Sequence, residues 1–251
     1  MNLSQYLTAL TNTQSIEALW DMHTRKMASY GFDRLLYGFT RYRSGNSLGD
    51  PEDYVVLSNH KAEYTDVFMG QGLYSHAPMV RWVLENEGAC SWSILGQMTE
   101  EGALSEAERK VIAFNQTMDV TAGYSISFES ISPRSKGAIA LTAQSGLSQD
   151  EVDAIWHKHG EDILVINNVA HLKIMTLPYS GPSRQLTKRQ REALEWVGDG
   201  KTTQDIAILM GLTPATVEKH LRLAREALSV ETTAQAVLKA ALQNQMFVME
   251  V

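Results

Sequence analysis

Two short helical patterns near the C-terminus, joined by a tight turn at Gly211, restrict the fold more than any other feature of this chain. The first helix is predicted over 203–210 and the second over 214–228. Thr213 can cap the second helix, and Pro214 occupies its first turn, where no backbone N–H donor is needed. Two such helices form a helix-turn-helix, whose second helix enters the DNA major groove.

A preceding helix, capped by Thr187 and predicted to run to Val197, completes a three-helix unit. Apolar residues at helical spacing supply its expected core: Ile206, Leu209, Leu212, Val217, Leu221 and Leu228. The sequence therefore predicts an all-α helix-turn-helix domain over 185–251.

The opposite face of the second helix carries charged residues. Glu218 and Arg222 lie one turn apart there. Arginine can contact guanine with two hydrogen bonds and glutamate can accept one from cytosine, so both are candidate base readers. Cations elsewhere in the unit are candidates for phosphate contacts: Lys188, Lys201, Lys219, His220 and Arg225. A solvated helix face is the alternative explanation for these charges.

The charge distribution supports this assignment. The whole chain of 251 residues has a net charge of −7, which by itself argues against nucleic acid. Residues 1–183 hold 13 Lys and Arg against 21 Asp and Glu, or −8, whereas residues 184–251 hold 9 against 8, or +1. The length favours two domains, and the segment 177–184, with two prolines, a glycine and two serines, has the composition of a linker.

Residues 1–176 alternate between helical and β-like patterns. Helices are predicted over 16–30, 61–68, 105–121 and 148–175, and strands over 35–42, 54–58, 124–130 and 137–143. Helices that flank a mainly antiparallel sheet give an α+β sandwich. Such a domain can enclose a pocket or a filled core, and the pattern does not distinguish them.

The C-terminal residues carry a family resemblance. From Leu186 to Leu228 the sequence resembles the LuxR-type DNA-binding domain, through residues at the positions that this pattern requires: Leu194, Gly200, Lys201, Ile206, Ala207, Thr216, Val217 and His220. Gln190 replaces the usual glutamate of the first helix, a near isostere without the charge. The resemblance implies that the last helix, 233–243, forms a homodimer through an apolar stripe: Ala234, Val237, Leu238 and Ala241.

Residues 1–176 resemble the autoinducer-binding domain of quorum-sensing LuxR-type regulators. That family has two aromatic residues four positions apart, an Asp-Pro pair, and a Trp fifteen residues after the Asp. Here Tyr64, Phe68, Ala77-Pro78 and Trp92 occupy these places, and His60 stands where a tyrosine usually binds the acyl carbonyl. The resemblance implies an N-acyl homoserine lactone or a related amphipathic signal.

Ala77 is the main departure from the family pattern. In relatives that bind N-acyl homoserine lactones, the Asp accepts a hydrogen bond from the ligand amide, and Ala77 cannot. An unpaired buried amide costs roughly 1–3 kcal/mol. Tyr64 can still donate to a lactone. Because of Ala77, however, an orphan receptor for another signal, or for none, is the main alternative.

The resemblance also implies residues on the sheet. Gly123 matches a family glycine, and strand residues lie on faces that line the tail channel in relatives: Leu36, Gly38, Ile139, Leu141 and Ala143. A filled core is the alternative interpretation of this second set.

The remaining features give no enzyme, metal or cofactor site. His157, His159 and Glu161 suit an exposed helix face, and Cys90 has no visible catalytic partner, so a signal-modifying enzyme is a remote alternative. There is no GxxxxGK[ST] phosphate loop. Without a signal peptide pattern, a membrane-length apolar stretch or a second cysteine, the sequence predicts a cytoplasmic regulator with DNA, a signal molecule and a second copy as partners.

Overall fold

The computed structural model describes residues 2–45, 47–179 and 184–247, which form two compact units. The first unit comprises Met1–Leu48 and Val56–Met175, and the second comprises Gly49–Val55 and Thr176–Val251. The loop 49–55 thus belongs to the second unit, which the sequence did not predict. Residues 180–183 of the predicted linker lie outside the described residues.

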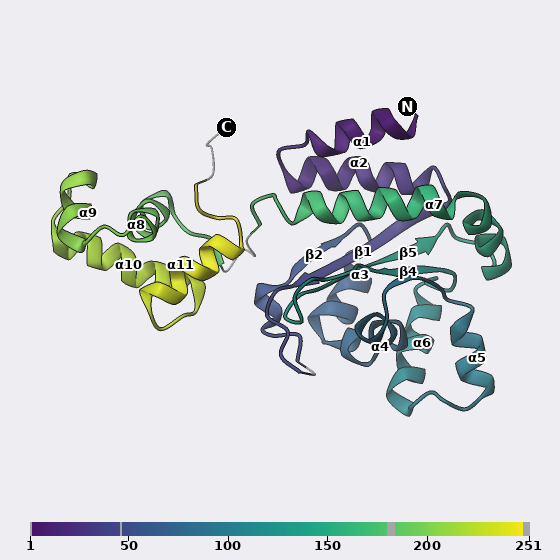
Figure 1. The fold of residues 1–251 in the computed structure, drawn as a ribbon. Coiled ribbons are helices and arrows are strands. Elements are labelled where there is room, and N and C mark those ends of the chain that lie inside the picture. The colour runs from purple at the N-terminus through teal and green to yellow at the C-terminus, as the bar shows by residue number, and fades with distance from the viewer. Residues whose placement is uncertain (1, 46, 180–183, 248–251) are drawn as a thin grey trace. The chain divides into compact units, whose positions relative to one another are not determined.

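A five-stranded sheet forms the centre of the first unit, in the order β2-β1-β5-β4-β3. The strands are β1 (Phe32–Thr40), β2 (Val55–Ser58), β3 (Gly88–Ser91), β4 (Gly123–Ser127) and β5 (Lys136–Ala143). β1 pairs antiparallel with β5, β5 with β4, and β4 with β3. Figure 1 shows the central strands lying between two layers of helices.

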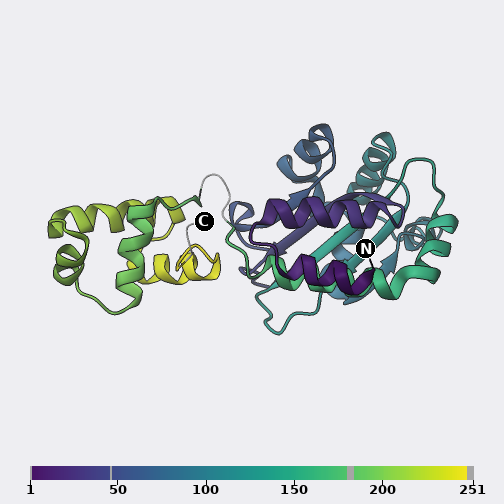
Figure 2. The ribbon, with the colours of Figure 1, turned by 90° about the horizontal axis from the view of Figure 1, so that it is seen from above.

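Helices cover both faces of this sheet, which confirms the predicted α+β sandwich. One layer consists of α1 (Leu3–Thr11), α2 (Ile16–Ala28) and α7 (Gln149–Ile174), which Figure 2 shows from above. The other layer consists of α3 (Ala62–Thr65), α4 (Pro78–Glu85), α5 (Ile94–Glu100) and α6 (Glu106–Thr117). Three of these helices, α1, α4 and α5, and the strand β3 were not predicted from the sequence.

Local hydrogen bonds explain where the long helices begin. Ser105 and Glu108 form the predicted capping box of α6, since the Ser105 hydroxyl accepts from the Glu108 amide and the Glu108 carboxylate accepts from the Ser105 amide. The helix ends at Thr117, four residues earlier than predicted. Asp119 has a φ of +57°, a left-handed conformation that a helix cannot continue through.

The layer of α1, α2 and α7 is joined to the sheet and to itself by aromatic and polar contacts. The Tyr37 hydroxyl lies 2.8 Å from Nδ1 of His171 on α7, and Tyr124 stacks on Trp156 with ring centres 3.9 Å apart. Between the helices, His23 is fully buried and bridges the Tyr6 hydroxyl and the Asn167 side chain. Each buried polar group of this bridge therefore has a partner.

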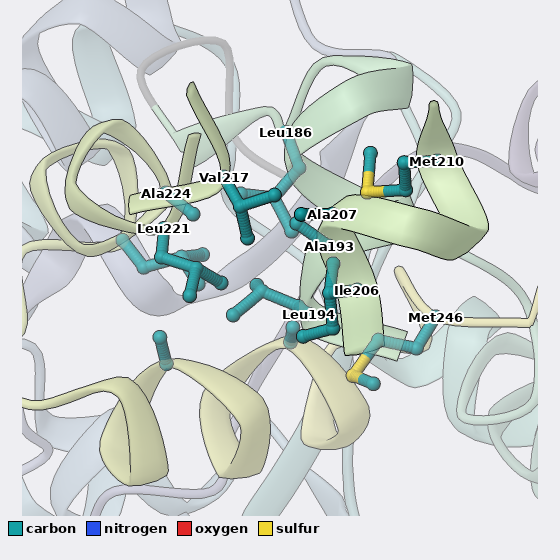
Figure 3. Close-up of a cluster of buried hydrophobic side chains, with 13 residues drawn as sticks. Leu186, Ala193, Leu194, Ile206, Ala207, Met210, Val217, Leu221, Ala224 and Met246 are labelled. Atoms are coloured by element: carbon teal, nitrogen blue, oxygen red, sulfur yellow. The ribbon is translucent and has the colours of Figure 1, made fainter. Parts of the chain in front are cut away.

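The second unit contains α8 (Lys188–Gly198), α9 (Thr203–Met210), α10 (Pro214–Leu228) and α11 (Thr233–Leu242). The predicted residues Ile206, Val217, Leu221 and Leu228 are buried in its core, which Figure 3 shows with several of its neighbours. Leu212 packs partly buried against that core. The core prediction for Leu209 is wrong: it is 50% exposed, because it lies on the outer side of the short helix α9.

Candidate functional site

Four aromatic rings from three segments stack beneath the sheet in the first unit. Tyr64 lies at the centre, with ring centres 4.4 Å from His60, 5.2 Å from Phe68 and 5.6 Å from Phe114. One helical turn separates Tyr64 from Phe68, where α3 widens into a π-turn over Asp66–Gly70. The sequence pattern marks His60, Tyr64 and Phe68 as candidate ligand-binding residues, but Phe114 of α6 was not predicted.

Trp92 belongs to the same cluster and packs closely against Gly123. The Trp92 indole Nε1 donates to the Ser125 hydroxyl at 2.9 Å. A Cβ added to Gly123 would lie 3.0 Å from the Trp92 ring and 2.3 Å from the Leu141 carbonyl oxygen. Gly123 is therefore required because no side chain fits beside Trp92 at this point of β4.

The strand register divides the predicted sheet residues between the two faces. Leu36 pairs with Ala140 and Gly38 with Ala138, whereas Ile139 and Leu141 pair with Tyr37 and Leu35. Paired residues of antiparallel strands point to the same face, and neighbours along a strand to opposite faces. Ile139, Leu141 and, by the same alternation, Ala143 therefore lie with Tyr37 on the face covered by α2 and α7.

The face that carries the aromatic cluster is lined mainly by small side chains. Its residues from β1, β5 and β4 include Leu36, Gly38, Ala138, Ala140, Thr142, Gly123, Ser125 and Ser127. Leu36 and Ala140 pack against the cluster of Tyr64, Phe68 and Trp92. A Cβ added to Gly38 would meet no atom within 4 Å, so there is open space at this point of the wall.

Burial sets the protonation of the cluster's polar groups. Burial, reinforced by the charge of Arg34, lowers the pKa of His60 to about 4, and burial raises the pKa of the Tyr64 hydroxyl against the opposing effect of Arg34. His60 is thus neutral and Tyr64 protonated near pH 7. The Tyr64 hydroxyl donates to Oδ1 of Asn115 at 3.3 Å, and His60 Nε2 lies 3.5 Å from the Thr142 hydroxyl.

Ala77 lies buried in this cluster, at 6% exposure, and it is the N-cap residue of α4. No side chain caps the helix there, although Pro78 follows in the first turn. The hydrophobic side chains buried in the cluster are those of Tyr64, Phe68, Ala77, Trp92, Val111 and Val120. Tyr64 contributes a hydroxyl, which can donate or accept, and Trp92 contributes an indole N–H, which can only donate.

A second candidate site lies on α10 in the C-terminal unit. The Thr213 hydroxyl caps the helix by accepting from the Thr216 amide. Glu218 and Arg222 are exposed, as predicted for base readers, but both have partners: Glu218 accepts from the Thr203 hydroxyl at 2.9 Å, and Arg222 pairs with Glu226 at 2.5 Å. An exposed ion pair within a helix is weak, so DNA can compete for Arg222.

The other predicted DNA-binding residues differ in their exposure. Lys188, Lys201 and Lys219 are exposed, whereas Thr216 and His220 are partly buried. Arg225 is also partly buried and donates to the Thr233 hydroxyl at 2.8 Å, which joins α10 to the first residue of α11. Arg225 therefore has a visible structural role in this unit.

Gln190, which replaces the usual glutamate, belongs to the capping box of α8. Its side-chain oxygen accepts from the Thr187 amide at 2.8 Å, while the Thr187 hydroxyl accepts from the Gln190 amide. An amide oxygen serves this purpose without a negative charge. Gln190 therefore caps α8 without a negative charge.

The weaker candidates have ordinary surroundings. His157 and Glu161 are exposed, and His159 is partly buried against the Tyr30 ring at 5.3 Å. Across residues 2–45, 47–179 and 184–247, no three His, Cys, Asp or Glu side chains group as metal ligands. The Cys90 thiol donates to the Ser91 carbonyl, and burial raises its pKa, which makes it less reactive. In the described part of the chain, no helix is long and apolar enough to span a membrane.

Family comparisons agree with the division into two units. The family described as "Autoinducer binding domain" matches residues 15–174, and the one described as "Sigma-70, region 4" matches residues 184–228. The transcriptional activator protein LuxR of Aliivibrio fischeri is 22% identical over 92% of this chain and 88% of its own length. The transcriptional activator protein AnoR of Acinetobacter nosocomialis is 23% identical over 94% of this chain and 95% of its own length.

Among solved structures, the N-acylhomoserine lactone dependent LuxR-family factor CepR2 from Burkholderia cenocepacia is similar to this chain. The match covers 69% of this chain and 93% of CepR2, with a TM-score of 0.53 and 16% identity. At this identity the likeness concerns the fold.

Proposed function

The chain belongs to the family of LuxR-type regulators with an autoinducer-binding domain, and on this basis we propose which residues bind its signal and which bind its DNA. Regulators of this type are ligand-responsive DNA-binding proteins of quorum sensing, and the chain is not an enzyme. The observation that carries the proposal is the small-residue wall of β1, β4 and β5 opposite the aromatic stack of His60, Tyr64 and Phe68.

The signal would lie between this wall and the aromatic stack, in contact with Trp92 and Ala77 of the same cluster. The Tyr64 hydroxyl and the Trp92 indole, which donate to Asn115 and Ser125 in the structure, would exchange these partners for carbonyl or lactone oxygens on the signal. Neutral His60 can donate or accept. The open space at Gly38 suits an apolar tail along β1 and β5.

Ala77 favours a signal without an amide, which is the orphan-receptor alternative. An amide N–H placed against Ala77 finds no acceptor in the methyl side chain of that residue. A lactone, ester or ketone needs no such acceptor, so it avoids the cost of roughly 1–3 kcal/mol for an unpaired polar group. N-acyl homoserine lactones stay within the proposed class, at reduced affinity.

Thermal unfolding of the full chain with a panel of compounds tests this proposal. The panel contains N-octanoyl homoserine lactone, its amide-free ester analogue and a phenyl-substituted lactone. A compound at one hundred times its dissociation constant adds about 2.7 kcal/mol of stability. We expect the ester analogue to stabilise the protein more than the amide does.

The matched variant is Tyr64→Phe, which keeps the ring stack and removes the hydroxyl that donates to Asn115. We expect it to fold and to lose about fivefold in affinity, since one hydrogen bond contributes about 1 kcal/mol. If the protein unfolds cooperatively and no compound raises its melting temperature, the receptor acts without these signals.

We further propose that Glu218 and Arg222 read bases, while the exposed cations Lys188, Lys201 and Lys219 contact phosphates. Three further residues of α10 are partly buried and would hold the helix in position on the DNA: Thr216, His220 and Arg225. Selection of preferred sites from a random duplex pool by the full chain gives its operator. Arg222→Ala should relax the preference at one position, whereas Lys219→Ala should weaken binding to all sequences alike.

We also propose that the protein acts as a homodimer in the cytoplasm. Ala234, Leu238 and Ala241 form an exposed stripe on α11, and Leu238 is 61% exposed. Val237 lies beside the stripe and packs partly against the unit's own core. A second copy that covers this stripe would bring two DNA-binding helices to two half-sites.

A further inference from the structure

The Gln149 side chain, on the first residue of α7, forms hydrogen bonds to both backbone groups of Gly123. Its Oε1 accepts from the Gly123 amide at 2.9 Å, and its Nε2 donates to the Gly123 carbonyl at 3.2 Å. A carboxamide carries the same donor and acceptor as a peptide group. Gln149 therefore pairs with Gly123 in the way that a residue of a neighbouring strand would.

This pairing occurs where the ladder between β3 and β4 stops, because β3 ends at Ser91. The Trp92 amide still donates to the Gly123 carbonyl at 3.1 Å. In a continuing antiparallel pair the Gly123 amide would donate back to the Trp92 carbonyl. That carbonyl instead accepts from the Leu95 amide, as the chain turns into α5. Gln149 supplies the acceptor that the buried Gly123 amide requires.

Three contacts attach Trp92 to β4, and two of them involve Gly123. The Trp92 amide donates to the Gly123 carbonyl, and the ring lies so close to Gly123 that an added Cβ would be 3.0 Å from it. The third contact is the hydrogen bond from the indole Nε1 to the Ser125 hydroxyl at 2.9 Å. A displacement of the Gly123 peptide would therefore move the Trp92 ring within the aromatic cluster.

A polar network fixes the orientation of the Gln149 carboxamide. Its Nε2 lies 3.0 Å from the Ser91 hydroxyl and 2.9 Å from Oδ1 of Asp153, one turn further along α7. The Ser91 hydroxyl donates to the same Asp153 oxygen at 2.7 Å. Burial raises the pKa of Asp153, but hydrogen bonds from Ser91, Gln149 and Tyr124 outweigh it and lower the pKa below its ordinary value. The carboxylate is thus charged near pH 7 and faces the NH2 end of Gln149.

We propose that Gln149 is a positioning residue of the signal site, which holds the Trp92 indole in place through the Gly123 peptide. This inference rests on the proposed function, in which Trp92 contacts the signal. The helix α7 does not need the Gln149 side chain in order to begin, because Ser148 and Glu151 form its capping box.

Fluorine NMR of the full chain labelled with 5-fluorotryptophan tests the positioning without any ligand. The chain has five tryptophans, and Trp92→Phe assigns the Trp92 resonance. We expect Gln149→Leu to shift or broaden this resonance and to leave that of Trp196 unchanged. Asp150→Asn, exposed in the same turn of α7, is the matched control and should change neither. An unchanged Trp92 resonance would overturn the proposal, and so would a shift confined to Trp156, because Gln149 would then fix only its own helix.

A pair of substitutions decides the question even if Gln149→Leu does not fold. Gln149→Glu keeps an acceptor for the Gly123 amide, but it removes the donor and places a second carboxylate beside Asp153. Asp153→Asn in the same chain relieves the repulsion and returns a donor to the network. We expect the Trp92 resonance to shift in Gln149→Glu and to return toward its wild-type position in the double variant. Effects of the two substitutions that simply add would contradict the proposal.

Titration with N-octanoyl homoserine lactone and its amide-free ester analogue measures the effect on binding. For each compound that binds the wild type, we expect Gln149→Leu to lose about fivefold in affinity, comparable to the loss of one hydrogen bond. Asp150→Asn should bind as the wild type does, and equal affinity in Gln149→Leu would overturn the role of Gln149. If neither compound binds the wild type, the proposed signal class fails, while the Trp92 resonance still decides whether Gln149 positions the indole.

Discussion

Gly123 shows how a single missing side chain shapes the proposed signal site. Gly123→Ala would force its new methyl group against the Leu141 carbonyl oxygen, at 2.3 Å, and the Trp92 ring. Because the obstacle includes backbone, we expect a loss of roughly 1–3 kcal/mol. Urea unfolding of the variant measures this loss.

Gly38→Ala is the control, since its added methyl group meets nothing within 4 Å. It should be neutral or slightly stabilising, because alanine restricts the unfolded chain more than glycine does. If both variants lost the same free energy of unfolding, the close packing of Trp92 on Gly123 would not be the cause of the loss.

Ala77→Asp tests the consequence of the missing carboxylate. At this N-cap position of α4 an aspartate can accept from a first-turn amide, which contributes about 0.5–2 kcal/mol. We expect affinity for N-octanoyl homoserine lactone to rise ten- to a hundredfold, while affinity for its amide-free analogue does not rise. Titration of both compounds, followed by tryptophan fluorescence, measures the ratio, and an equal change for both would contradict this explanation of Ala77.

At the scale of single elements, caps were the most predictable features. Thr213-Pro214 before α10 and Ser105 with Glu108 before α6 are local signals, and the structure contains both. The region from 69 to 104 has no clear period, so β3, α4 and α5 could not be predicted. Their formation depends on contacts with residues distant in the sequence.

The two faces of β5 were equally hard to distinguish. Both faces of the sheet are covered by helices, so Ile139 and Leu141 alternate with Ala138 and Ala140 and no polar side remains to mark the register. The family resemblance named these strand residues but did not indicate which face of the sheet each one lies on. In the structure, the pairing of Leu36 with Ala140 places both on the face with the aromatic cluster, opposite the face covered by α2 and α7.

The exposed stripe of α11 leads to a prediction about assembly. Leu238→Glu places a charge on the exposed side of the helix, so the unit's own core stays intact. If the stripe is the dimer contact, burial of that charge would shift the protein toward monomer by at least tenfold in dissociation constant. Sedimentation equilibrium measures this shift, and Gln235→Glu, exposed on the same helix, is the control.

For the whole molecule, two buried histidines and one partly buried histidine make stability dependent on pH. Burial lowers the pKa of His23, His60 and His171 to about 4 in each case. In the unfolded chain the pKa is about 6.5, so the unfolded state takes up protons first. Stability is therefore complete above about pH 6.5 and falls as the pH decreases toward 4, by up to roughly 3 kcal/mol per histidine.

Urea unfolding at several pH values between 7.5 and 4.5 measures this dependence. His171→Gln should reduce the slope, because it removes one of the three groups, whereas exposed His157→Gln should leave the slope unchanged. A slope that is the same in both variants and in the wild type would exclude His171 as a source.

The sequence predicted the division of the molecule into an α+β unit and a helical unit, but not the attachment of 49–55 to the second. No local pattern in that loop marks Asp53 as buried, because its partners Arg184 and Lys239 are more than a hundred residues away along the chain. Such clusters depend on the final fold and have no periodic signature.

The small-residue wall has a thermodynamic consequence for recognition. Glycine and alanine have no rotamers to lose, and serine and threonine have few, so a signal that settles on Gly38, Ala138 and Ala140 immobilises almost no protein torsions. Much of the entropy lost on binding is then that of the signal's own chain. Stiff or cyclic signals would gain affinity here for that reason, without any additional contact.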